Sequence, residues 1–294
     1  MPENFKNIAY VLDTFSSHDI KRWGKNHEEI ARYYWEHYSH FAHQRSLIQD
    51  KLKEALVAQC RPFEFSNWVR AVNYEYSIEP LSARGSLNSP GGRFNISDID
   101  ETKFSKFPAL YLAEDYETAY REKFGLNQTD IKNGLTAEEL SLASNTSFST
   151  LYINGSVNEV LDINDSAALT DFFNLIKDIK LPYVYIRRAA KLGLPLEKPV
   201  ASLEELMKTL LLPNWRDKVM QADIPANSQI LGQIAYQAGI EAILYPSTKA
   251  SNKKCLAVFP GNFAQSLSYI EIVGSCPEVV KNKRIDENSY RNFI

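Results

Sequence analysis

A short glycine-rich loop that ends in an arginine is the first feature of the sequence that could carry chemistry. Residues 88–95 read Asn-Ser-Pro-Gly-Gly-Arg-Phe-Asn, and three of the 12 glycines, Gly85, Gly91 and Gly92, lie within eight positions. Paired glycines behind a proline allow positive φ angles and let another group approach the backbone closely. Arg93 follows at once. The loop is therefore predicted to lie close to a ligand, and its basic residue suits an anion.

Four other residues have types and settings that could serve a reaction, and each also has an ordinary structural interpretation. Arg70 lies inside the apolar strand sequence WVRAV, where an arginine must extend to solvent, pair with a carboxylate or face a cavity. Tyr111 ends an apolar strand and could simply be a core aromatic residue. Glu122 lies on the next helix at the edge of its apolar stripe, where it could be solvated. Ser247 follows Pro246 at the mouth of a predicted hairpin and could be a turn serine.

The distribution of histidine and cysteine excludes several kinds of catalytic centre. All five histidines lie in the first 43 residues, which counts against a Ser-His-Asp hydrolase, a papain-like protease and a histidine-ligated metal centre in the rest of the chain. The three cysteines, Cys60, Cys255 and Cys276, have neither CxxC spacing nor a disulfide framework. The sequence also contains no GxxxxGK[ST] and no GxGxxG that opens a helix. We therefore expect no metal and no common nucleotide-binding loop.

Charge and hydropathy limit the partners of the protein. The formal net charge is −3 and the pI is about 6.0, so a diffuse attraction to nucleic acid or to an anionic membrane is disfavoured and any anion site must be local. No stretch approaches the roughly 18 apolar residues that a membrane-spanning helix needs, and the start MPENFKN is not typical of a secretory signal. We expect a cytoplasmic protein that binds neither nucleic acid nor membrane.

The elements that must position these residues form an α+β pattern. Residues 17 to about 60 have helical periodicity, and short β-type runs alternate with helical pieces from Arg61 onward. Strands are expected at 67–72, 109–113, 150–154, 160–163, 241–246, 255–260 and 269–273. Helices are expected at 115–124, 165–179, 202–212 and 228–239, with caps at several ends. The predicted domains are a helical N-terminal domain at 1–60 and a second domain at 61–294.

The N-terminal helix offers a different candidate site. Arg32 and His37 have the Arg-x4-His spacing of helical ribonucleases of the HEPN type, although an i, i+5 pair does not share one helix face well. The neighbour of Arg32 is Tyr33, where those enzymes have a small polar residue. His37, His40 and His43 could also suggest a metal. The alternative is that all of these are ordinary residues of a helix surface or interface.

Taken in order, the pieces resemble the RES domain, a family named for an arginine, a glutamate and a serine. The matching segments are WVRAV, RGSLNSPGGRFN, ALYLAEDYETAYREKF and AGIEAILYPSTK with KKCLAVFPGNF, which cover roughly 66–125 and 228–263. Most of the resemblance comes from the glycine–arginine loop, the YLAE strand and the Ala-x-x-Glu helix. The chain departs from the family at Ala71, where many members have an aromatic residue or valine, and at Phe94, which replaces a commoner tryptophan.

The chain also differs from compact members of the family in length. More than 100 residues separate Glu122 from Ser247, about twice the span in a compact member. Residues 126–227 are therefore predicted to be a mixed insertion that covers the pocket or recruits a partner.

The resemblance implies an ADP-ribosyltransferase-like fold and roles for individual residues. The expected catalytic residues match the family's glutamate, arginine and serine: Glu122, Arg70 and Ser247. The expected substrate-binding residues match the strand tyrosine and the glycine loop: Tyr111, Arg93 and Gly92. Several RES proteins are toxins that degrade NAD by phosphorolysis or that modify proteins with ADP-ribose. NAD is therefore the expected substrate, with no bound cofactor, and an antitoxin and a second copy of the chain are the expected protein partners.

The chemistry of NAD agrees with these residue types. Guanidinium groups bind phosphate oxygens in a two-pronged geometry, and a glycine turn presents backbone N–H groups to an anion or lets a ligand lie close. A carboxylate stabilises the positive charge that develops on the ribose as nicotinamide leaves, and an aromatic face suits the nicotinamide ring. The sequence thus favours an NAD phosphorylase or glycohydrolase that acts as a toxin. A protein ADP-ribosyltransferase and a non-catalytic interaction protein on a RES scaffold are the alternatives.

Overall fold

A single mixed sheet forms the centre of the molecule. The computed structural model describes residues 17–126, 148–280 and 282–294, so parts of the predicted N-terminal domain (1–16) and insertion (127–147) lie outside the described residues. Within those ranges the sheet has seven strands: β1 (Arg61–Asn73), β2 (Leu110–Ala113), β3 (Phe148–Asp162), β4 (Ala242–Pro246), β5 (Lys254–Val258), β6 (Tyr269–Ile272) and β7 (Arg284–Ile285).

The strand order is β1-β2-β5-β4-β3-β6-β7, and β1 also pairs with β3. This extra pairing is long and antiparallel, from Arg61 opposite Val160 to Asn73 opposite Phe148, so five strands close into a ring. The pair β3–β4 is parallel, whereas the other pairs are antiparallel. The sheet therefore curves strongly, and the predicted α+β class is confirmed.

Alternation along the short central strands gives the sheet two apolar faces. In β4, Ala242 and Leu244 pack into one core, while Ile243 and Tyr245 pack into the other. Successive side chains of a strand point to opposite faces, so a strand that is apolar at every position is buried on both. Helices pack against one face of the sheet and form the first core. The C-terminal segment, including Phe263 and Phe293, packs against the other face and forms the second core.

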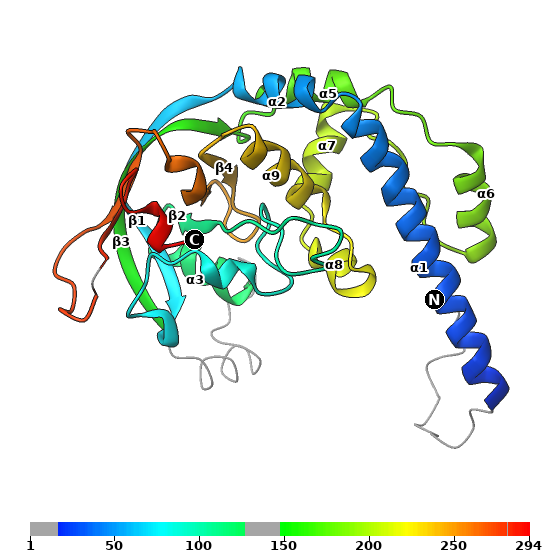
Figure 1. Cartoon of the computed structure of the whole chain (residues 1–294), viewed down its shortest axis with the longest axis horizontal. Coiled ribbons are helices and arrows are strands. Elements are labelled where there is room, and N and C mark those ends of the chain that lie inside the picture. The colour runs from blue at the N-terminus through cyan, green and yellow to red at the C-terminus, as the bar shows by residue number, and fades with distance from the viewer. Residues whose placement is uncertain (1–16, 127–147, 281) are drawn as a thin grey trace.

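Helices cover one face of the sheet. They are α1 (Ser17–Ser46), α2 (Gln49–Val57), α3 (Tyr116–Phe124), α5 (Thr170–Ile176), α6 (Tyr183–Leu192), α7 (Leu203–Leu210), α8 (Arg216–Ala222) and α9 (Asn227–Gln237). Short 3₁₀ turns lie at Tyr74–Tyr76, Arg84–Leu87, Ser166–Leu169, Pro260–Phe263 and Tyr290–Asn292. Figure 1 shows the sheet on the left, α9 and α7 beside it, and the long helix α1 at the right next to α6.

Local capping fixes the ends of the helices that matter for the site. Asp115 accepts a hydrogen bond from Thr118 N at 2.8 Å and begins α3, and Gly125 ends it at a φ of 71°. Ser202 accepts from Glu205 N at 3.1 Å and begins α7. A side-chain acceptor at the N-cap satisfies a backbone donor that the helix leaves unpaired, and a residue of positive φ ends the helix. The N-caps Asp115 and Ser202 lie where the sequence predicted helices to begin.

The N-terminal helices and the predicted insertion share a core with the sheet. Leu52 and Leu56 of α2 are fully buried in the same cluster as Val69 of β1. Within the range 126–227, residues 148–162 are the long strand β3, which pairs with β1, β4 and β6. In the described part of this range, the helices that follow β3, from α5 to α8, lie outside the sheet; we call them the insertion helices.

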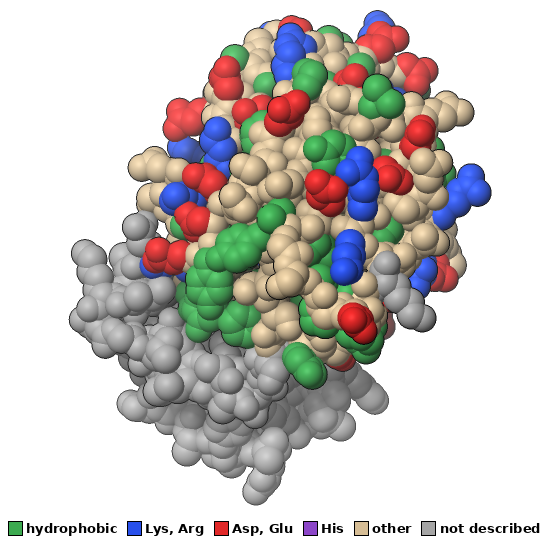
Figure 2. Space-filling view, turned by 90° about the vertical axis from the view of Figure 1, so that its left-hand side faces the viewer, with side chains coloured by type: hydrophobic (Ala, Val, Ile, Leu, Met, Phe, Trp, Pro, Cys, Tyr) green, Lys and Arg blue, Asp and Glu red, His purple; other side chains and the backbone are tan. Residues whose placement is uncertain are grey.

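The surface on the sheet's side of the molecule carries mixed charge. Figure 2 shows Lys and Arg interspersed with Asp and Glu over this surface, together with a group of hydrophobic side chains. Within the described part of the chain, no helix has the length and apolar character to cross a membrane.

Candidate active site

Glu122 lies at the pocket between α3 and the β4–β5 hairpin. One carboxylate oxygen, Oε1, accepts hydrogen bonds from Ser247 Oγ at 2.5 Å and from Thr248 N at 3.1 Å. Among the described residues no hydrogen bond engages the other oxygen, Oε2. Helix α3 places Glu122 here because Ala119, one turn earlier on the same stripe, packs into the core. The carboxylate is therefore held through one oxygen and is free to act through the other.

Ser247 positions Glu122 and does not itself line the pocket. Its Oγ donates to the carboxylate and accepts from the backbone N–H groups of Lys249 and Ala250, at 3.1 and 3.0 Å. Ser247 N also donates to Lys253 O at 2.8 Å, which closes the hairpin. The resemblance to the RES family implied that Ser247 is a catalytic residue. The geometry instead supports an indirect role, in which Ser247 orients the carboxylate of Glu122 and does not contact the substrate.

The glycine loop lies directly on the ring of Tyr111. Tyr111 Oη accepts from Phe94 N and donates to Asn95 Oδ1, both at 2.9 Å. Gly92 N donates to Asn95 Oδ1 at 2.9 Å, and Gly91 N donates to Asn88 O at 2.7 Å. These backbone N–H groups are used inside the protein, so they do not form an anion-binding nest. The glycines therefore serve to let the loop backbone lie close to the Tyr111 ring, and not to present N–H groups to an anion.

Gly92 is required by this contact. A Cβ atom at position 92 would lie 2.3 Å from three atoms of the Tyr111 side chain. We therefore expect Gly92→Ala to displace the loop or the ring and to lower both the thermal midpoint and catalytic turnover, as overpacking typically costs about 1–3 kcal/mol. The matched control is Gly24→Ala in α1, where no atom lies within 4 Å of the added methyl group. Equal midpoints and equal turnover for the two variants would contradict the contact.

Sequence reasoning missed the residue that holds the loop from the other side. Gln229 is fully buried in the first turn of α9, and its Nε2 donates to the carbonyl oxygens of Pro90, Gly92 and Asn95, at 2.9, 3.2 and 2.9 Å. Gly232, one turn later, lets the helix approach so closely that a Cβ there would lie 2.0 Å from Phe94 O. A polar residue within the apolar face of the predicted helix 228–239 was the only signal in the sequence.

Arg93 joins the glycine loop to the insertion helices. Its Nη1 donates to the carbonyl oxygens of Leu210 and Leu212, at 3.3 and 2.9 Å. Its Nη2 donates to Thr248 Oγ1 at 3.1 Å, next to the Glu122 carboxylate. Arg93 is only 7% exposed, and burial lowers the pKa of its guanidinium. Three of the five N–H donors of the side chain are engaged, which leaves donors for a ligand.

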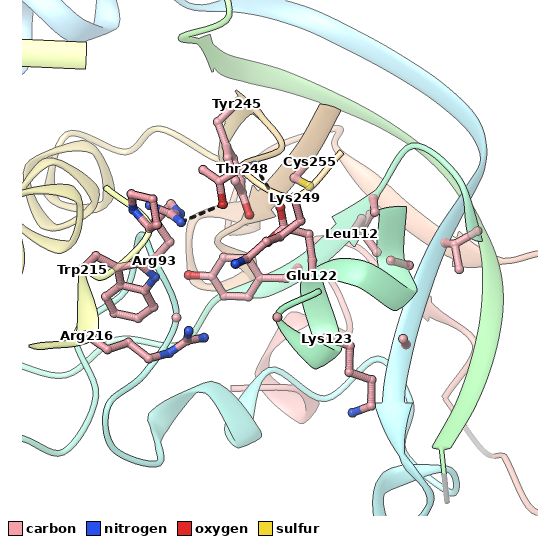
Figure 3. A pocket seen from close by; sticks show the side chains of 18 residues that line it. Arg93, Leu112, Glu122, Lys123, Trp215, Arg216, Tyr245, Thr248, Lys249 and Cys255 are labelled. Atoms are coloured by element: carbon pink, nitrogen blue, oxygen red, sulfur yellow. Dashed lines mark hydrogen bonds between the residues drawn. The ribbon is translucent and has the colours of Figure 1, made fainter. Parts of the chain in front are cut away.

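The insertion helices supply one wall of the pocket. Trp215 is 5% exposed and packs with Val219 and Ala226, and the guanidinium of Arg216 lies 4.7 Å from its ring centre. Figure 3 shows Arg93, Trp215 and Arg216 on one side of the pocket and Glu122 on the other. Neither Trp215 nor Arg216 was predicted as a site residue. They lie at the start of α8, more than 90 residues after Glu122 in the chain, and nothing in the local sequence indicates that they face the same pocket.

The pocket is small and positively charged. Its volume is about 250 Å³, below the roughly 300–1,000 Å³ of sites that enclose a whole drug-sized ligand, so it encloses only part of a dinucleotide. Among the described residues that line it, four are cations and one is a carboxylate: Arg93, Lys123, Arg216, Lys249 and Glu122. In a chain of net charge −3 this is a local concentration of positive charge, as the sequence analysis requires of any anion site.

Arg70 lies outside the pocket. Its neighbours in β1, Val69 and Ala71, line the pocket, so alternation along the strand turns Arg70 to the opposite face. There its guanidinium donates to the carbonyl oxygens of Pro80, Tyr111 and Ser82, at 2.6, 3.3 and 2.7 Å. Burial lowers its pKa to about 10. The geometry does not support the catalytic role that the resemblance implied and gives Arg70 a structural role.

We expect Arg70→Lys to act on stability. A lysine ammonium cannot reach three carbonyl groups in the planar arrangement of a guanidinium, so at least one buried carbonyl loses its partner. The expected loss is about 1–3 kcal/mol in the free energy of unfolding, measured by urea denaturation. The KM for substrate should not change in the folded variant. A raised KM with unchanged stability would instead place Arg70 at the substrate.

The thiol and the two phenols that line the pocket, those of Cys255, Tyr111 and Tyr245, remain neutral. Burial, followed by the nearby charge of Glu122, raises the pKa of the Cys255 thiol, so it is protonated at neutral pH and is not a nucleophile. Burial also raises the pKa of Tyr111 and Tyr245. The phenol of Tyr111 therefore stays in its neutral, hydrogen-bonding form, and Glu122 is the one carboxylate among the described residues that line the pocket.

The N-terminal histidines belong to a helix interface. His37 is 7% exposed, and its Nε2 lies 3.0 Å from Glu197 O, beside Tyr185 of α6. His40 Nε2 lies 3.0 Å from Lys180 O, whereas Arg32 is exposed. Within the described residues no group of three or more His, Cys, Asp or Glu side chains could hold a metal ion. These placements favour the interface interpretation over a ribonuclease site.

Comparison with known proteins gives the family. The RES domain matches residues 67–273, most of the chain, so the protein belongs to the RES domain family and the predicted resemblance is confirmed. No curated protein matches the chain significantly. One similar solved structure is the crystal structure of the M. tuberculosis MbcT–MbcA toxin–antitoxin complex, which is 16% identical and covers 83% of this chain and 96% of that chain, with a TM-score of 0.41. That overlap is too low to define the function of this chain.

Proposed function

We propose that the protein cleaves the bond between nicotinamide and ribose in NAD. The observation that carries this proposal is the setting of Glu122, a carboxylate fixed through one oxygen in a pocket whose other charged lining residues, among those described, are all cations. Positive charge around the rest of the pocket suits a pyrophosphate, and the single carboxylate suits a centre where positive charge develops. Membership of the RES domain family supports the same substrate.

The expected reaction needs no metal step and no covalent protein group. The C–N bond breaks with its electrons going to the pyridinium nitrogen, so nicotinamide leaves as a neutral molecule and the ribose becomes an oxocarbenium ion. Glu122 Oε2 stabilises that ion or holds a ribose hydroxyl, as carboxylates do in glycoside hydrolysis. The ring of Tyr111 offers a flat face to nicotinamide. An acceptor oxygen then bonds to the ribose carbon and loses its proton to solvent.

The acceptor distinguishes three reactions. Inorganic phosphate would make the protein an NAD phosphorylase, water an NAD glycohydrolase, and a side chain of another protein an ADP-ribosyltransferase. Each would deplete NAD or modify proteins, so we propose that the protein is a toxin when no partner restrains it, and that an antitoxin protein is that partner. A protein with the RES fold but no activity is the alternative from another class. The fixed carboxylate argues against it, because an idle site has no need for one.

Product analysis tests the proposal. Purified protein is incubated with NAD in buffer, with inorganic phosphate, and with a cell extract, and products are identified by mass. We expect free nicotinamide together with phosphorylated ADP-ribose, ADP-ribose or ADP-ribosylated protein, and we expect chelator to leave the rate unchanged. Expression should inhibit bacterial growth. No nicotinamide under any condition, from folded protein, would refute the proposal.

A further inference from the structure

The cations that line the pocket differ in how far the protein itself uses them. Arg93 donates to Leu210, Leu212 and Thr248, and Lys123 donates to Asn73 Oδ1. Arg216 has no hydrogen bond and no ion pair with any other described residue. Its guanidinium only lies on the Trp215 ring. A cation that no carboxylate neutralises is available to an anionic ligand.

The position of Arg216 is fixed although its charge is unpaired. Trp215 precedes it at the start of α8 and is buried against Val219, Ala226 and Ile99, so the backbone at Arg216 is anchored. Stacking on the indole then orients the guanidinium and leaves its edge of N–H groups exposed. Arg93 holds the preceding segment by its bonds to Leu210 and Leu212. The insertion helices thus deliver a preoriented cation to the pocket.

The charge of Arg216 is close to the groups that would meet the substrate. Burial raises the pKa of the Tyr111 hydroxyl, and the nearby charges of Arg93 and Arg216 oppose that rise. Arg216 and Arg93 also share one aromatic neighbour, because their guanidinium groups lie 4.7 Å and 5.9 Å from the centre of the Trp215 ring. Two guanidinium groups that share one aromatic residue and have no carboxylate between them suit a doubly charged, oxygen-rich group.

We infer that Arg216 binds a phosphate oxyanion of the substrate in this pocket, and we rest the identity of that substrate on the proposed function. The oxyanion has two sources in the proposed reaction, the pyrophosphate of NAD and the inorganic phosphate acceptor. Trp215 acts as the positioning residue for Arg216. On this account the insertion helices are part of the substrate site, and binding depends on a side chain outside 66–125 and 228–263, the ranges on which the sequence analysis based the resemblance.

Titration calorimetry tests this assignment. ADP and inorganic phosphate are titrated separately into wild-type protein, Arg216→Gln and the matched control Arg187→Gln, which changes an exposed arginine of α6 far from the pocket lining. A charged hydrogen bond contributes about 1.5–3 kcal/mol, so we expect Arg216→Gln to weaken one of the two ligands about 10- to 100-fold. Arg187→Gln should bind as the wild type does, and Arg216→Lys should keep part of the affinity. Equal thermal midpoints check that the variants fold.

The ligand whose affinity Arg216→Gln lowers identifies the source of the oxyanion. Weaker ADP binding assigns Arg216 to the pyrophosphate, and weaker phosphate binding assigns it to the acceptor. Equal affinities of Arg216→Gln and Arg187→Gln for both ligands, or no binding of either ligand to the wild type, would overturn the inference. Wild-type protein that binds ADP through Arg216 but releases no nicotinamide would refute the proposed function alone. Release of nicotinamide with KM values for both NAD and inorganic phosphate that Arg216→Gln leaves unchanged would refute the inference alone.

Discussion

Replacement of Glu122 by glutamine is expected to reduce kcat for nicotinamide release by roughly 10²–10³, with little change in KM. Glutamine keeps the size of glutamate and can still accept from Ser247 Oγ and Thr248 N, so the side chain should stay in place. What it loses is the negative charge at Oε2. That charge matters most when the ribose becomes positive, which happens in the transition state and not in bound NAD.

Steady-state rates over a range of NAD concentrations separate the two parameters. The control is Glu204→Gln on α7, which makes the same chemical change at an exposed ion pair with Lys208, away from the pocket. Its kcat and KM should equal those of the wild type. If Glu122→Gln raised KM and left kcat intact, Glu122 would be a binding residue and the proposed role of its charge would be wrong.

Replacement of Gln229 by methionine is expected to have the largest effect on stability. Methionine has nearly the same shape but no donor, so the carbonyl oxygens of Pro90, Gly92 and Asn95 would lose their shared partner in a buried site. Each unpaired buried carbonyl costs about 1–3 kcal/mol. We expect a loss of about 2–5 kcal/mol in the free energy of unfolding, measured by urea denaturation.

A second glutamine on the same helix provides the comparison. Gln237 is exposed at the end of α9 and makes one side-chain hydrogen bond, with Gln49. Gln237→Met should change stability by about 0.5 kcal/mol or less, as exposed substitutions usually do. Gln229→Met should also lower turnover, because the loop that carries Gly92 and Arg93 would be loosened. Equal stability of the two variants would mean that the loop holds its shape without Gln229.

The sequence predicted most elements because their local signals agree with the tertiary structure. The apolar runs at 109–113, 241–246 and 255–260 became β2, β4 and β5, and the capped helices begin where Asp115 and Ser202 indicated. The two short runs at 150–154 and 160–163 are one strand, β3. Gly155, which lies between the two runs, does not form a turn. It lets the Phe65 ring of β1 lie against the backbone of β3, because a Cβ at position 155 would lie 2.6 Å from that ring.

Helices α6 and α8 were not predicted, and neither was the way the helices assemble. Helix α6 packs against α1, although more than 130 residues separate them, and α8 presents Trp215 and Arg216 to a pocket made by β2 and α3. No periodicity within a segment reports which distant segment it will contact. Long-range packing therefore decides what the sequence pattern leaves open.

The same distinction applies to the candidate site. Residue type and order were enough to bring Glu122, Ser247 and Arg93 together, because each sits next to a structural signal: a helix cap, a hairpin or a glycine turn. Arg70 was expected in the pocket because it matches the family's arginine. The register of β1 decides which of its side chains face the pocket. Val69 and Ala71 face it, so Arg70, which lies between them, points to the opposite side of the strand. The resemblance suggested a role that the alternation of the strand does not support.

The central claim is that this pocket binds NAD with the nicotinamide ribose at Glu122, and a crystal structure of Glu122→Gln soaked with NAD tests it most directly. The variant should bind the dinucleotide without consuming it. We predict that the ribose next to nicotinamide lies within hydrogen-bond distance of the residue 122 amide, that the nicotinamide ring lies on Tyr111, and that the pyrophosphate faces Arg93 and Arg216. NAD bound elsewhere on the molecule, or with its adenosine at residue 122 and its nicotinamide outside the pocket, would contradict the claim.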